Sequence, residues 1–373
     1  MKSYQKRLAL FLLVLLLLPL GWSSANAESR YSANAACVLE VKTGRVLYEK
    51  NADAPMPMAS TTKVLTAIIA IESGQLESIV ACPDAASGVE GSSLYLKPGE
   101  QFTLLDLVYG LMLHSGNDAA EAIAIHLAGS VDGFCALMNE KARTIGCENS
   151  NFQNPHGLPS DNHYTTARDL AKISAYAMQN ITFRQVVGTQ YHEMYPQGEG
   201  EKRTLKNKNK LLWNYENATG IKTGFTKEAG RCLVAASQTD SLDVVAVVLS
   251  SPDMWNDTME LMDEAHATYW MTQQCEENQS LGTIPVEKGR TTQVELSLAD
   301  ACYFPLRIDG TEEVTVDVEK PASLTAPFEK GMVVGKATYS FAGTPIATID
   351  VVTVEGVEKQ TLWQKVKRFF GGT

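Results

Sequence analysis

A serine and a lysine three residues apart open a strongly apolar segment near residue 60. Ser60 and Lys63 stand in ASTTKVLTAIIAIESG, where apolar residues recur at helical spacing. Residues three apart share one face of a helix, so the Ser60 hydroxyl and the Lys63 amine can meet. A serine hydroxyl needs a neighbouring base to become a nucleophile, and a lysine kept neutral by burial and a nearby cation can be that base. The pair predicts a nucleophilic serine, but by itself it is weak evidence.

Two further motifs supply a second hydroxyl, an amide and a second lysine. Ser115-Gly116-Asn117 falls at a break between two predicted helices, and Lys222-Thr223-Gly224 precedes two apolar, strand-like runs. The hydroxyl of Ser115 can relay a proton, and the Asn117 amide can hold a peptide group because it both donates and accepts. Asn117 can also cap a helix, which is compatible with that role. A lysine and a threonine at a sheet edge can bind a carboxylate, and the glycine leaves room for a ligand.

KTG occurs twice, and the first copy has a sufficient structural explanation. Apolar runs at Cys37–Val41 and Val46–Tyr48 flank Lys42-Thr43-Gly44-Arg45. Gly44 favours a turn, so this segment is predicted to be a hairpin. We therefore attribute the chemistry to the copy at Lys222, which follows the other two motifs.

Helices flanking a sheet must hold the three motifs together. Val- and Ala-rich runs predict two paired core strands, with Lys222 on an adjacent strand at the sheet edge. The architecture is therefore an α/β or α+β domain. After Glu276, short β-like runs between Val286 and Val354 predict a small all-β module. The predicted core strands are Leu233–Ser237 and Val244–Ser250, and the predicted helices start at Ala59 or cover about Leu104–Leu113, Asn117 or Asp118 to Leu127, Thr166–Met178 and Trp255–Trp270.

The two ends of the chain carry predicted targeting segments. A basic start, an apolar run at Leu8–Leu20 and the sequence Ala25-Asn26-Ala27 predict a signal peptide over residues 1–27, with an uncleaved anchor as the alternative. Residues 357–373 predict an amphipathic helix lying in a membrane surface, because an aromatic, apolar face opposes a basic one. The alternative is a helix that packs on its own domain.

Composition excludes several classes of function. The chain has 373 residues and a formal net charge of −11, which argues against a nucleic-acid partner. Its seven cysteines are odd in number and contain no C-x-x-C, and its six histidines are scattered. We therefore expect no metal, no cofactor and no disulfide scaffold. Cys37 and Cys232, in apolar runs, are interpreted as small buried hydrophobes.

The three motifs in this order are the signature of penicillin-binding proteins and β-lactamases. The chain resembles the low-molecular-mass penicillin-binding proteins, specifically the serine D-alanyl-D-alanine carboxypeptidases. The likeness covers nearly the whole chain beyond the signal peptide and includes PMASTTKVLTA, HSGNDAA, NPHGLPSDNHYTTARDLA, LLWNY and GIKTGFTKEAGRCLVAAS. It implies a β-lactamase/transpeptidase-like catalytic domain over 28–275, a small all-β domain over 276–356 and the terminal amphipathic helix. It also implies an exported enzyme, attached peripherally to the outer face of the cytoplasmic membrane.

The resemblance implies a mechanism through an acyl-enzyme. Ser60 attacks the carbonyl of the penultimate D-alanine of a peptidoglycan stem peptide, Lys63 takes its proton, and Ser115 relays the proton to the departing D-alanine. Water then releases the shortened stem, whereas β-lactam antibiotics acylate and inhibit the enzyme.

The resemblance also implies how the substrate is held. Asn117 holds the substrate backbone, Lys222 and Thr223 bind the terminal carboxylate, and Gly224 gives the backbone room. The backbone N–H groups of Ser60 and Phe225 bind the oxyanion.

Three positions qualify the resemblance. Phe225 replaces a histidine of some members, and only its backbone is expected to act. Lys208 stands where some relatives have an arginine near the carboxylate, and its role is open. His156 in NPHGL is expected to position other groups.

Other functions remain possible on the same scaffold. A class A β-lactamase uses a glutamate-held water for deacylation, and the sequence shows no convincing counterpart. Endopeptidase or transpeptidase activity is not excluded, and a silent β-lactam- or peptidoglycan-binding protein is the remaining alternative. The sequence does not indicate growth stage, oligomeric state or the choice between precursor and mature wall.

Overall fold

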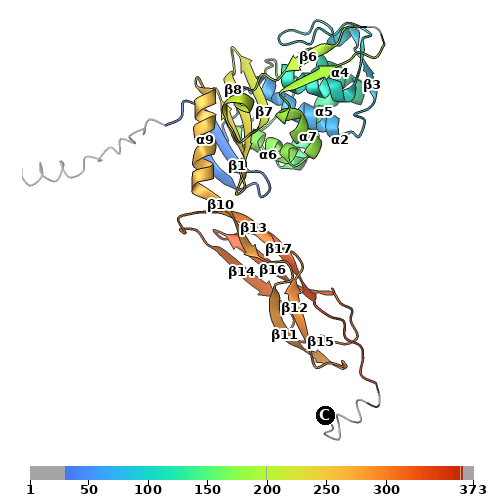
Figure 1. The fold of residues 1–373 in the computed structure, drawn as a ribbon, viewed down its shortest axis with the longest axis vertical. Helices are drawn as coiled ribbons and strands as arrows, with labels where there is room; N and C mark the ends of the chain where they lie inside the picture. Colours follow the sequence, from blue (N-terminus) through green and yellow to red (C-terminus); the bar gives the residue numbers. More distant parts are fainter. Residues whose placement is uncertain (1–29, 199, 362, 364–373) are drawn as a thin grey trace, which may run out of the picture. The chain divides into compact units, whose positions relative to one another are not determined.

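The computed structural model describes residues 30–198, 200–361 and 363 (Figure 1). The predicted signal peptide over 1–27 lies outside the described residues, as do residues 362 and 364–373 of the predicted terminal helix. The start of that helix is wrong, because Val357 and Lys359 form isolated β-bridges with Phe328 and Gly289. In the described part of the chain, no single helix combines the length and the apolar composition needed to cross a bilayer.

A five-stranded antiparallel sheet forms the centre of the domain that carries the three motifs. Its strand order is β2-β1-β9-β8-β7, which places β7 at one edge. The predicted hairpin and the two predicted core strands are confirmed, and the second KTG lies on the edge strand as expected. The strands are β1 (Ala35–Glu40), β2 (Val46–Lys50), β7 (Ala218–Thr226), β8 (Gly230–Gln238) and β9 (Asp243–Leu249).

Helices cover both faces of this sheet. Every residue of β1 is buried, and so is almost every residue of β9, because α6 (Ala167–Met178) contacts both strands and α9 (Met254–Thr268) contacts β8 and β9. Figure 1 shows α9 on one side of the sheet and α6 on the other. Strands buried on both faces are continuously apolar rather than alternating, as in the run VVAVVL of β9.

The remaining helices and two small hairpins pack beside the sheet. The central helix is α2 (Lys63–Glu72), in which eight of ten residues are buried. The other elements are α3 (Leu104–Tyr109), the π-helical turn η3 (Gly110–His114), α4 (Asn117–Ala128), α5 (Val131–Ile145), α7 (Ile181–Gly188), α8 (Leu211–Asn214), the 3-10 turns η1 (Ala59–Thr62) and η2 (Asp84–Ala86), and the strand pairs β3 (Ile79–Ala81) with β4 (Gln101–Thr103) and β5 (Tyr191–Met194) with β6 (Arg203–Lys206).

The predicted helix from Ala59 begins as a 3-10 turn instead of an α-helix. The Thr61 and Thr62 hydroxyls donate to the backbone carbonyls of Met58 and Ala59, at 2.6 and 2.9 Å. Side chains that bond nearby backbone carbonyls compete with the α-helical pattern, so the regular helix starts only at Lys63.

The C-terminal part is built from β-strands, as predicted. A six-stranded sheet has the order β14-β16-β17-β12-β11-β15, and β10 pairs separately with β13. The predicted helix over Trp255–Trp270 is wrong at its end, because Tyr269 and Trp270 already belong to β10; this strand therefore precedes the expected domain boundary at 275. The strands are β10 (Tyr269–Cys275), β11 (Ser280–Glu287), β12 (Gln293–Leu298), β13 (Cys302–Arg307), β14 (Val314–Glu319), β15 (Leu324–Thr325), β16 (Val333–Phe341) and β17 (Thr344–Thr353).

All seven cysteines are buried free thiols. Burial raises the pKa of Cys37 to about 12 and that of Cys232 to about 11. These two thiols therefore stay protonated at neutral pH, in agreement with their interpretation as small hydrophobic side chains.

Asp118 fastens a loop of the helical region to the start of α4. Its carboxylate has no exposed surface and accepts hydrogen bonds from the Ser93 hydroxyl and from the backbone N–H groups of Leu94 and Leu96. The same loop receives the backbone N–H of Asn117 at the Ser92 carbonyl, at 2.7 Å. One buried charge thus holds the loop against the helix that follows Ser115.

We expect Asp118→Asn to lower the free energy of unfolding by about 2–4 kcal/mol, because the new amide turns a donor toward N–H groups that need an acceptor. Chemical denaturation of the two proteins measures the difference. Asp161→Asn, at an exposed turn, is the control and should change stability by less than about 0.5 kcal/mol. Equal midpoints for the Asp118 variant and the parent protein would contradict the proposed anchoring.

Candidate active site

The structure brings Ser60 and Lys63 together as predicted. Lys63 Nζ lies 3.0 Å from Ser60 Oγ, 2.7 Å from Asn117 Oδ1 and 2.6 Å from the His156 carbonyl oxygen. Lys63 is fully buried, with 0% of its surface exposed. Three oxygens therefore surround a lysine nitrogen that has no contact with bulk water.

These three contacts suit a neutral amine acting as a base. An ammonium would donate to all three oxygens, whereas a neutral amine has two N–H groups and one lone pair. Asn117 Oδ1 and the His156 carbonyl can only accept, so they take the two N–H groups. The lone pair then faces Ser60 Oγ, the one contact atom that carries its own proton.

Burial and nearby cations favour the neutral form of Lys63. Desolvation lowers its pKa well below the ordinary lysine value, and the positive charges of Lys222 and Lys208 lower it further, while Asp118 acts in the opposite direction. Lys222 is itself buried, and desolvation together with the charge of Lys208 lowers its pKa to about 7. Lys222 is therefore the second lysine near Lys63, and it lowers the pKa of Lys63 when it carries its proton.

Ser115 reaches the site through an unusual stretch of backbone. The π-helical turn η3 precedes it, and Ser115 adopts a left-handed conformation with φ 66° and ψ 33°. Such conformations cost free energy in residues other than glycine and cluster at functional sites. Among the described residues, the Ser115 hydroxyl has no hydrogen-bond partner, and Ser115 lines the cavity that also contains Ser60. This hydroxyl is therefore free to bond a substrate.

The Asn117 amide makes hydrogen bonds within the protein that the sequence did not predict. Its Oδ1 accepts from Lys63, and its Nδ2 donates to the Glu90 carbonyl at 2.5 Å. Asn117 is also the first residue of α4. One N–H of its amide is left over, and the other contacts orient Lys63.

Gly224 allows the edge strand to approach the turn that carries Ser60. A Cβ atom at Gly224 would lie 3.0 Å from the Met58 carbonyl oxygen and 3.1 Å from the backbone nitrogens of Ser60 and Thr61. These distances are closer than ordinary van der Waals contact. A side chain here would require the neighbouring backbone to move by a few tenths of an ångström, so glycine favours the close approach of β7 to Ser60.

The side chains meet in an open cavity of about 330 Å³. It contains four of the predicted site residues besides Ser60, and Phe225, with 64% of its surface exposed, forms part of the rim. Sequence reasoning missed Ser92, Arg231, Met254 and Trp255, which no motif marked. The cavity is lined by Ser60, Ser92, Ser115, Lys208, Thr223, Gly224, Phe225, Arg231, Met254 and Trp255.

Two histidines support the turn from behind and do not line this cavity. The backbone of His156 holds Lys63, and its ring lies 3.4 Å from the Glu121 carboxylate, which agrees with the expected positioning role. The His163 ring accepts from the Gln153 N–H at 3.0 Å and therefore donates through Nε2 to the Thr62 hydroxyl at 2.9 Å. Burial lowers the pKa of His163 to about 4, so the ring is neutral in this role.

The first KTG is a structural turn. The buried Glu40 carboxylate accepts from the backbone N–H groups of Lys42 and Thr43 and from the Thr43 hydroxyl. The neighbouring Arg45 guanidinium donates a hydrogen bond to the Glu312 carboxylate and lies over the Phe341 ring. The hairpin therefore contacts residues of the β-rich part. Throughout residues 30–198 and 200–361, no cluster of three or more His, Cys, Asp or Glu side chains is arranged to hold a metal ion.

The chain is similar to known proteins. The family described as D-alanyl-D-alanine carboxypeptidase matches residues 23–253, and the C-terminal domain of penicillin-binding protein 5 matches residues 269–359. The chain is 29% identical over 355 residues to D-alanyl-D-alanine carboxypeptidase DacF of Bacillus subtilis, covering 93% of this chain and 91% of that protein. It is 36% identical over 269 residues to a D-alanyl-D-alanine carboxypeptidase of Streptomyces sp. strain K15, covering 66% and 92%.

Solved structures agree with the sequence comparisons. Penicillin-binding protein 5 from Haemophilus influenzae matches with a TM-score of 0.73 at 27% identity, over 88% of this chain and 98% of that one. The similarity therefore extends over both the catalytic and the β-rich parts.

We expect Gly224→Ala to slow the reaction of Ser60 with benzylpenicillin by about tenfold or more, because the added methyl group pushes β7 away from the nucleophile. Mass spectrometry of samples quenched at successive times measures the rate of adduct formation. Phe225→Ala is the matched control, since it removes an exposed ring and keeps the backbone, and its rate should stay within about threefold. An unchanged rate in the Gly224 variant would show that the close approach is not required.

Proposed function

Because the chain belongs to the D-alanyl-D-alanine carboxypeptidase family, we propose that it removes the terminal D-alanine from peptidoglycan stem peptides through an acyl-enzyme on Ser60. One observation carries the assignment of the nucleophile. The buried Lys63 amine lies 3.0 Å from Ser60 Oγ, while two protein oxygens that can only accept occupy its other contacts. This geometry leaves the lone pair directed at the Ser60 proton.

In the acylation step, Ser60 Oγ bonds to the carbonyl carbon of the penultimate D-alanine and its proton passes to Lys63. The backbone N–H groups of Ser60 and Phe225 stabilise the negative oxygen that forms. The bond to the terminal D-alanine then breaks. Lys63 returns the proton through the Ser115 hydroxyl to the departing amine. Water attacks the ester, restores the Ser60 hydroxyl and releases the shortened peptide.

Three groups suit the terminal carboxylate of the substrate. Thr223 and Lys208 line the same cavity as Ser60, and Lys222 is the residue before Thr223 on β7. In this role the substrate carboxylate pairs with lysine charges that otherwise repel each other. The spare N–H of Asn117 is suited to a substrate carbonyl, while the rest of its amide orients Lys63.

The cavity favours a long-lived acyl-enzyme over a β-lactamase. None of the described residues that line it is acidic. A deacylating water therefore lacks the carboxylate that holds it in class A β-lactamases. We accordingly place β-lactams among the inhibitors, not among the substrates that turn over quickly.

The proposed location is outside the cytoplasm. The predicted signal peptide over 1–27 supports export, and the amphipathic pattern over 357–373 supports peripheral attachment to the outer face of the membrane.

Intact-mass measurement of a chain beginning at Glu28, after addition of benzylpenicillin, tests the nucleophile. We expect one covalent adduct that maps to Ser60 and persists for minutes or longer, and release of D-alanine from a D-Ala-D-Ala pentapeptide. Ser60→Ala should abolish both reactions. Lys63→Gln should lower both by about 10²-fold or more, because it removes the base, whereas Lys336→Gln on exposed β16 should not. An adduct that disappears within seconds would favour a β-lactamase, and no adduct on folded protein would favour a silent binder.

The lysine pKa values predict a bell-shaped dependence of kcat/KM on pH. Activity should rise with pH as Lys63 loses its proton, at a lower pH than for an ordinary lysine because its pKa is lowered. It should fall above about pH 7, because the pKa of Lys222 in the free enzyme is about 7 and Lys222 loses its positive charge above that pH. The decline depends on the charge of the substrate, since Lys222 is needed only for a carboxylate.

A peptide with its terminal carboxylate masked as a methyl ester should therefore lose the falling limb and keep the rising one. Steady-state rates from pH 5 to 10 with both peptides measure this difference. The same falling limb with the ester would exclude Lys222 as its cause.

A further inference from the structure

Two of the buried cysteines face each other across a pair of strands. Cys275 ends β10, Cys302 begins β13, and the two residues are direct partners in the antiparallel register. Their surfaces are 3% and 5% exposed, and both belong to the hydrophobic core of the β-rich part. Among the strand pairs of the described residues, this is the one position at which cysteine lies opposite cysteine.

A β-bulge produces this register. Gln273 lies opposite Tyr303, and one extra residue, Gln274, then precedes Cys275 on β10. Uninterrupted pairing would place Gln274 opposite Cys302. The bulge therefore brings Cys275 into register with Cys302 and turns its side chain into the core, since a bulge shifts every later residue of its strand by one position.

The spacing of the two strands suits a bond between the sulfur atoms. Opposed residues of antiparallel strands have side chains on the same face and Cα atoms about 4.5–5.5 Å apart. A disulfide requires a Cα separation of about 4.4–6.8 Å. Two contacts of the sulfurs agree with this geometry. Cys275 Sγ lies 3.8 Å from the carbonyl oxygen of Asp300, two residues before Cys302. Burial first, and then the Cys275 and Cys302 thiols, raise the pKa of Tyr339, so both sulfurs lie near one phenol.

The other thiols have different neighbours. Cys37 lies opposite Glu49 and Val247, and Cys232 lies opposite Gly224. The remaining cysteines lie outside the strands, and they are Cys82, Cys135 and Cys147. A thiol in such surroundings acts as a small hydrophobic side chain, whereas two opposed thiols can be oxidised together.

We propose that Cys275 and Cys302 form a disulfide in the mature protein, which joins β10 to β13 and closes residues 276–301 into a loop. The oxidant is a low-molecular-mass disulfide. The thiolate of one cysteine attacks a sulfur of the oxidant, which forms a mixed disulfide and releases one small thiol. The thiolate of the other cysteine attacks the protein sulfur of that mixed disulfide, which forms the Cys275–Cys302 bond and releases the second small thiol. The protein loses two electrons and two protons, and the oxidant gains them.

The bond is expected to form while the chain folds. Burial and then the neighbouring Cys275 raise the pKa of the Cys302 thiol, and only a thiolate attacks a disulfide. Exchange is therefore slow once the core has closed over both sulfurs, and faster before it closes. The proposed export places folding where disulfides persist.

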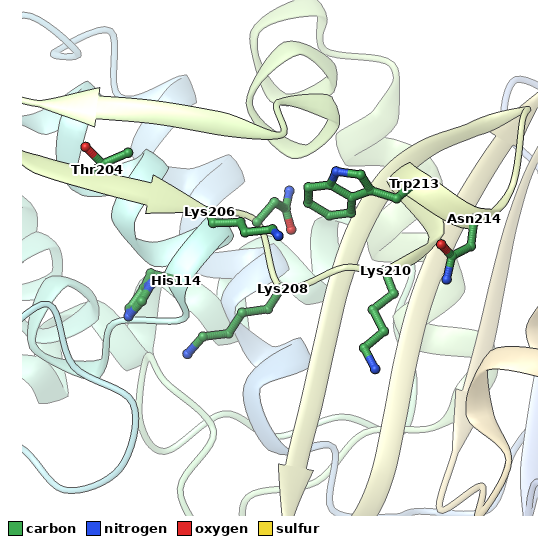
Figure 2. A pocket seen from close by; sticks show the side chains of 8 residues that line it. His114, Thr204, Lys206, Lys208, Lys210, Trp213 and Asn214 are labelled. Carbon is green, nitrogen blue, oxygen red and sulfur yellow. The ribbon is translucent and has the colours of Figure 1, made fainter.

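The proposed disulfide is structural and not catalytic. Within the described part of the chain, neither thiol lines the cavity that contains Ser60 or the neighbouring hollow around Lys208, which Figure 2 shows. A cross-link restricts the unfolded chain, so its effect should appear in stability. Counting of thiols and thermal unfolding are therefore the informative measurements.

Refolding of the chain from Glu28 onward in a mixture of reduced and oxidised glutathione tests the proposal. After denaturation without reductant, we expect iodoacetamide to modify all but two of the seven cysteines. Before alkylation the chain should be about 2 Da lighter than the reduced chain, and digestion should give one peptide pair linked through Cys275 and Cys302. Reduction should lower the melting temperature of the β-rich part by about 5 °C or more, because the unfolded chain regains its freedom.

Single substitutions locate the bond. Cys275→Ala and Cys302→Ala should each leave every remaining cysteine open to alkylation, with a melting temperature that no longer depends on reductant. Cys135→Ala is the matched control, since it removes another buried thiol, from α5. This variant should keep both the linked peptide pair and the dependence on reductant.

Three results would overturn the proposal. The first is modification of all seven cysteines after refolding in the glutathione mixture. The second is a disulfide that joins Cys275 or Cys302 to any other cysteine. The third is a stable glutathione adduct on either residue, because an opposed thiol at disulfide distance would displace the glutathione. None of these results depends on release of D-alanine or on the penicillin adduct, so the proposed function is tested separately.

Discussion

The active site depends on keeping one lysine without water. Lys63 is completely buried and faces two oxygens that can only accept, so its lone pair has one direction left, toward Ser60. A fully buried ammonium would require compensation from charges, and the cations Lys222 and Lys208 each lower the pKa of Lys63 more than the Asp118 carboxylate raises it. The surrounding elements of the fold each provide something that a buried, neutral Lys63 requires. The apolar helix α2 supplies burial, the loop at His156 and the start of α4 supply acceptors, and the sheet edge supplies the second cation.

Two strained backbone positions lie where these elements join. Ala59 and Ser115 both have positive φ values, 50° and 66°, although neither is glycine. Gly157 is also left-handed, and a Cβ atom there would overlap the Ala59 carbonyl. These conformations are tolerated because the surrounding packing determines them. A sheet with both faces covered and a nearly all-buried central helix supply that packing, so the rigid part of the domain stabilises the strained part.

The sequence predicted the elements and motifs better than the contacts between them. Short motifs located Ser60, Ser115 and Lys222, because the proposed nucleophile, proton relay and anion site each need a particular residue type. Local patterns could not show that the Asn117 amide would hydrogen-bond to Lys63 and to the Glu90 carbonyl, since those partners are distant in sequence. They also missed His163 behind the Thr62 hydroxyl and Arg231 on the cavity wall, because one histidine or arginine carries no spacing signal. The helix end at Thr268 was misplaced for a related reason: Tyr269 and Trp270 fit an apolar helical face, but pairing with β13 made them a strand.

In the proposed reaction, the cluster of lysines also couples substrate binding to the strength of the base. In the empty site, burial first and then the charges of Lys222 and Lys208 lower the pKa of Lys63, which favours the neutral amine but makes it a weaker proton acceptor. A substrate carboxylate bound beside Lys222 cancels much of that positive field, because opposite charges at short range in a poorly solvated site interact strongly. The basicity of Lys63 then rises when the scissile bond is in place. Such a lysine is already neutral at neutral pH in the empty site, and it becomes a stronger base only when substrate is bound. A lysine of fixed pKa cannot combine these two properties. The same reasoning explains why the lysines crowd together in an acidic protein: their mutual repulsion in the empty site becomes attraction for the substrate.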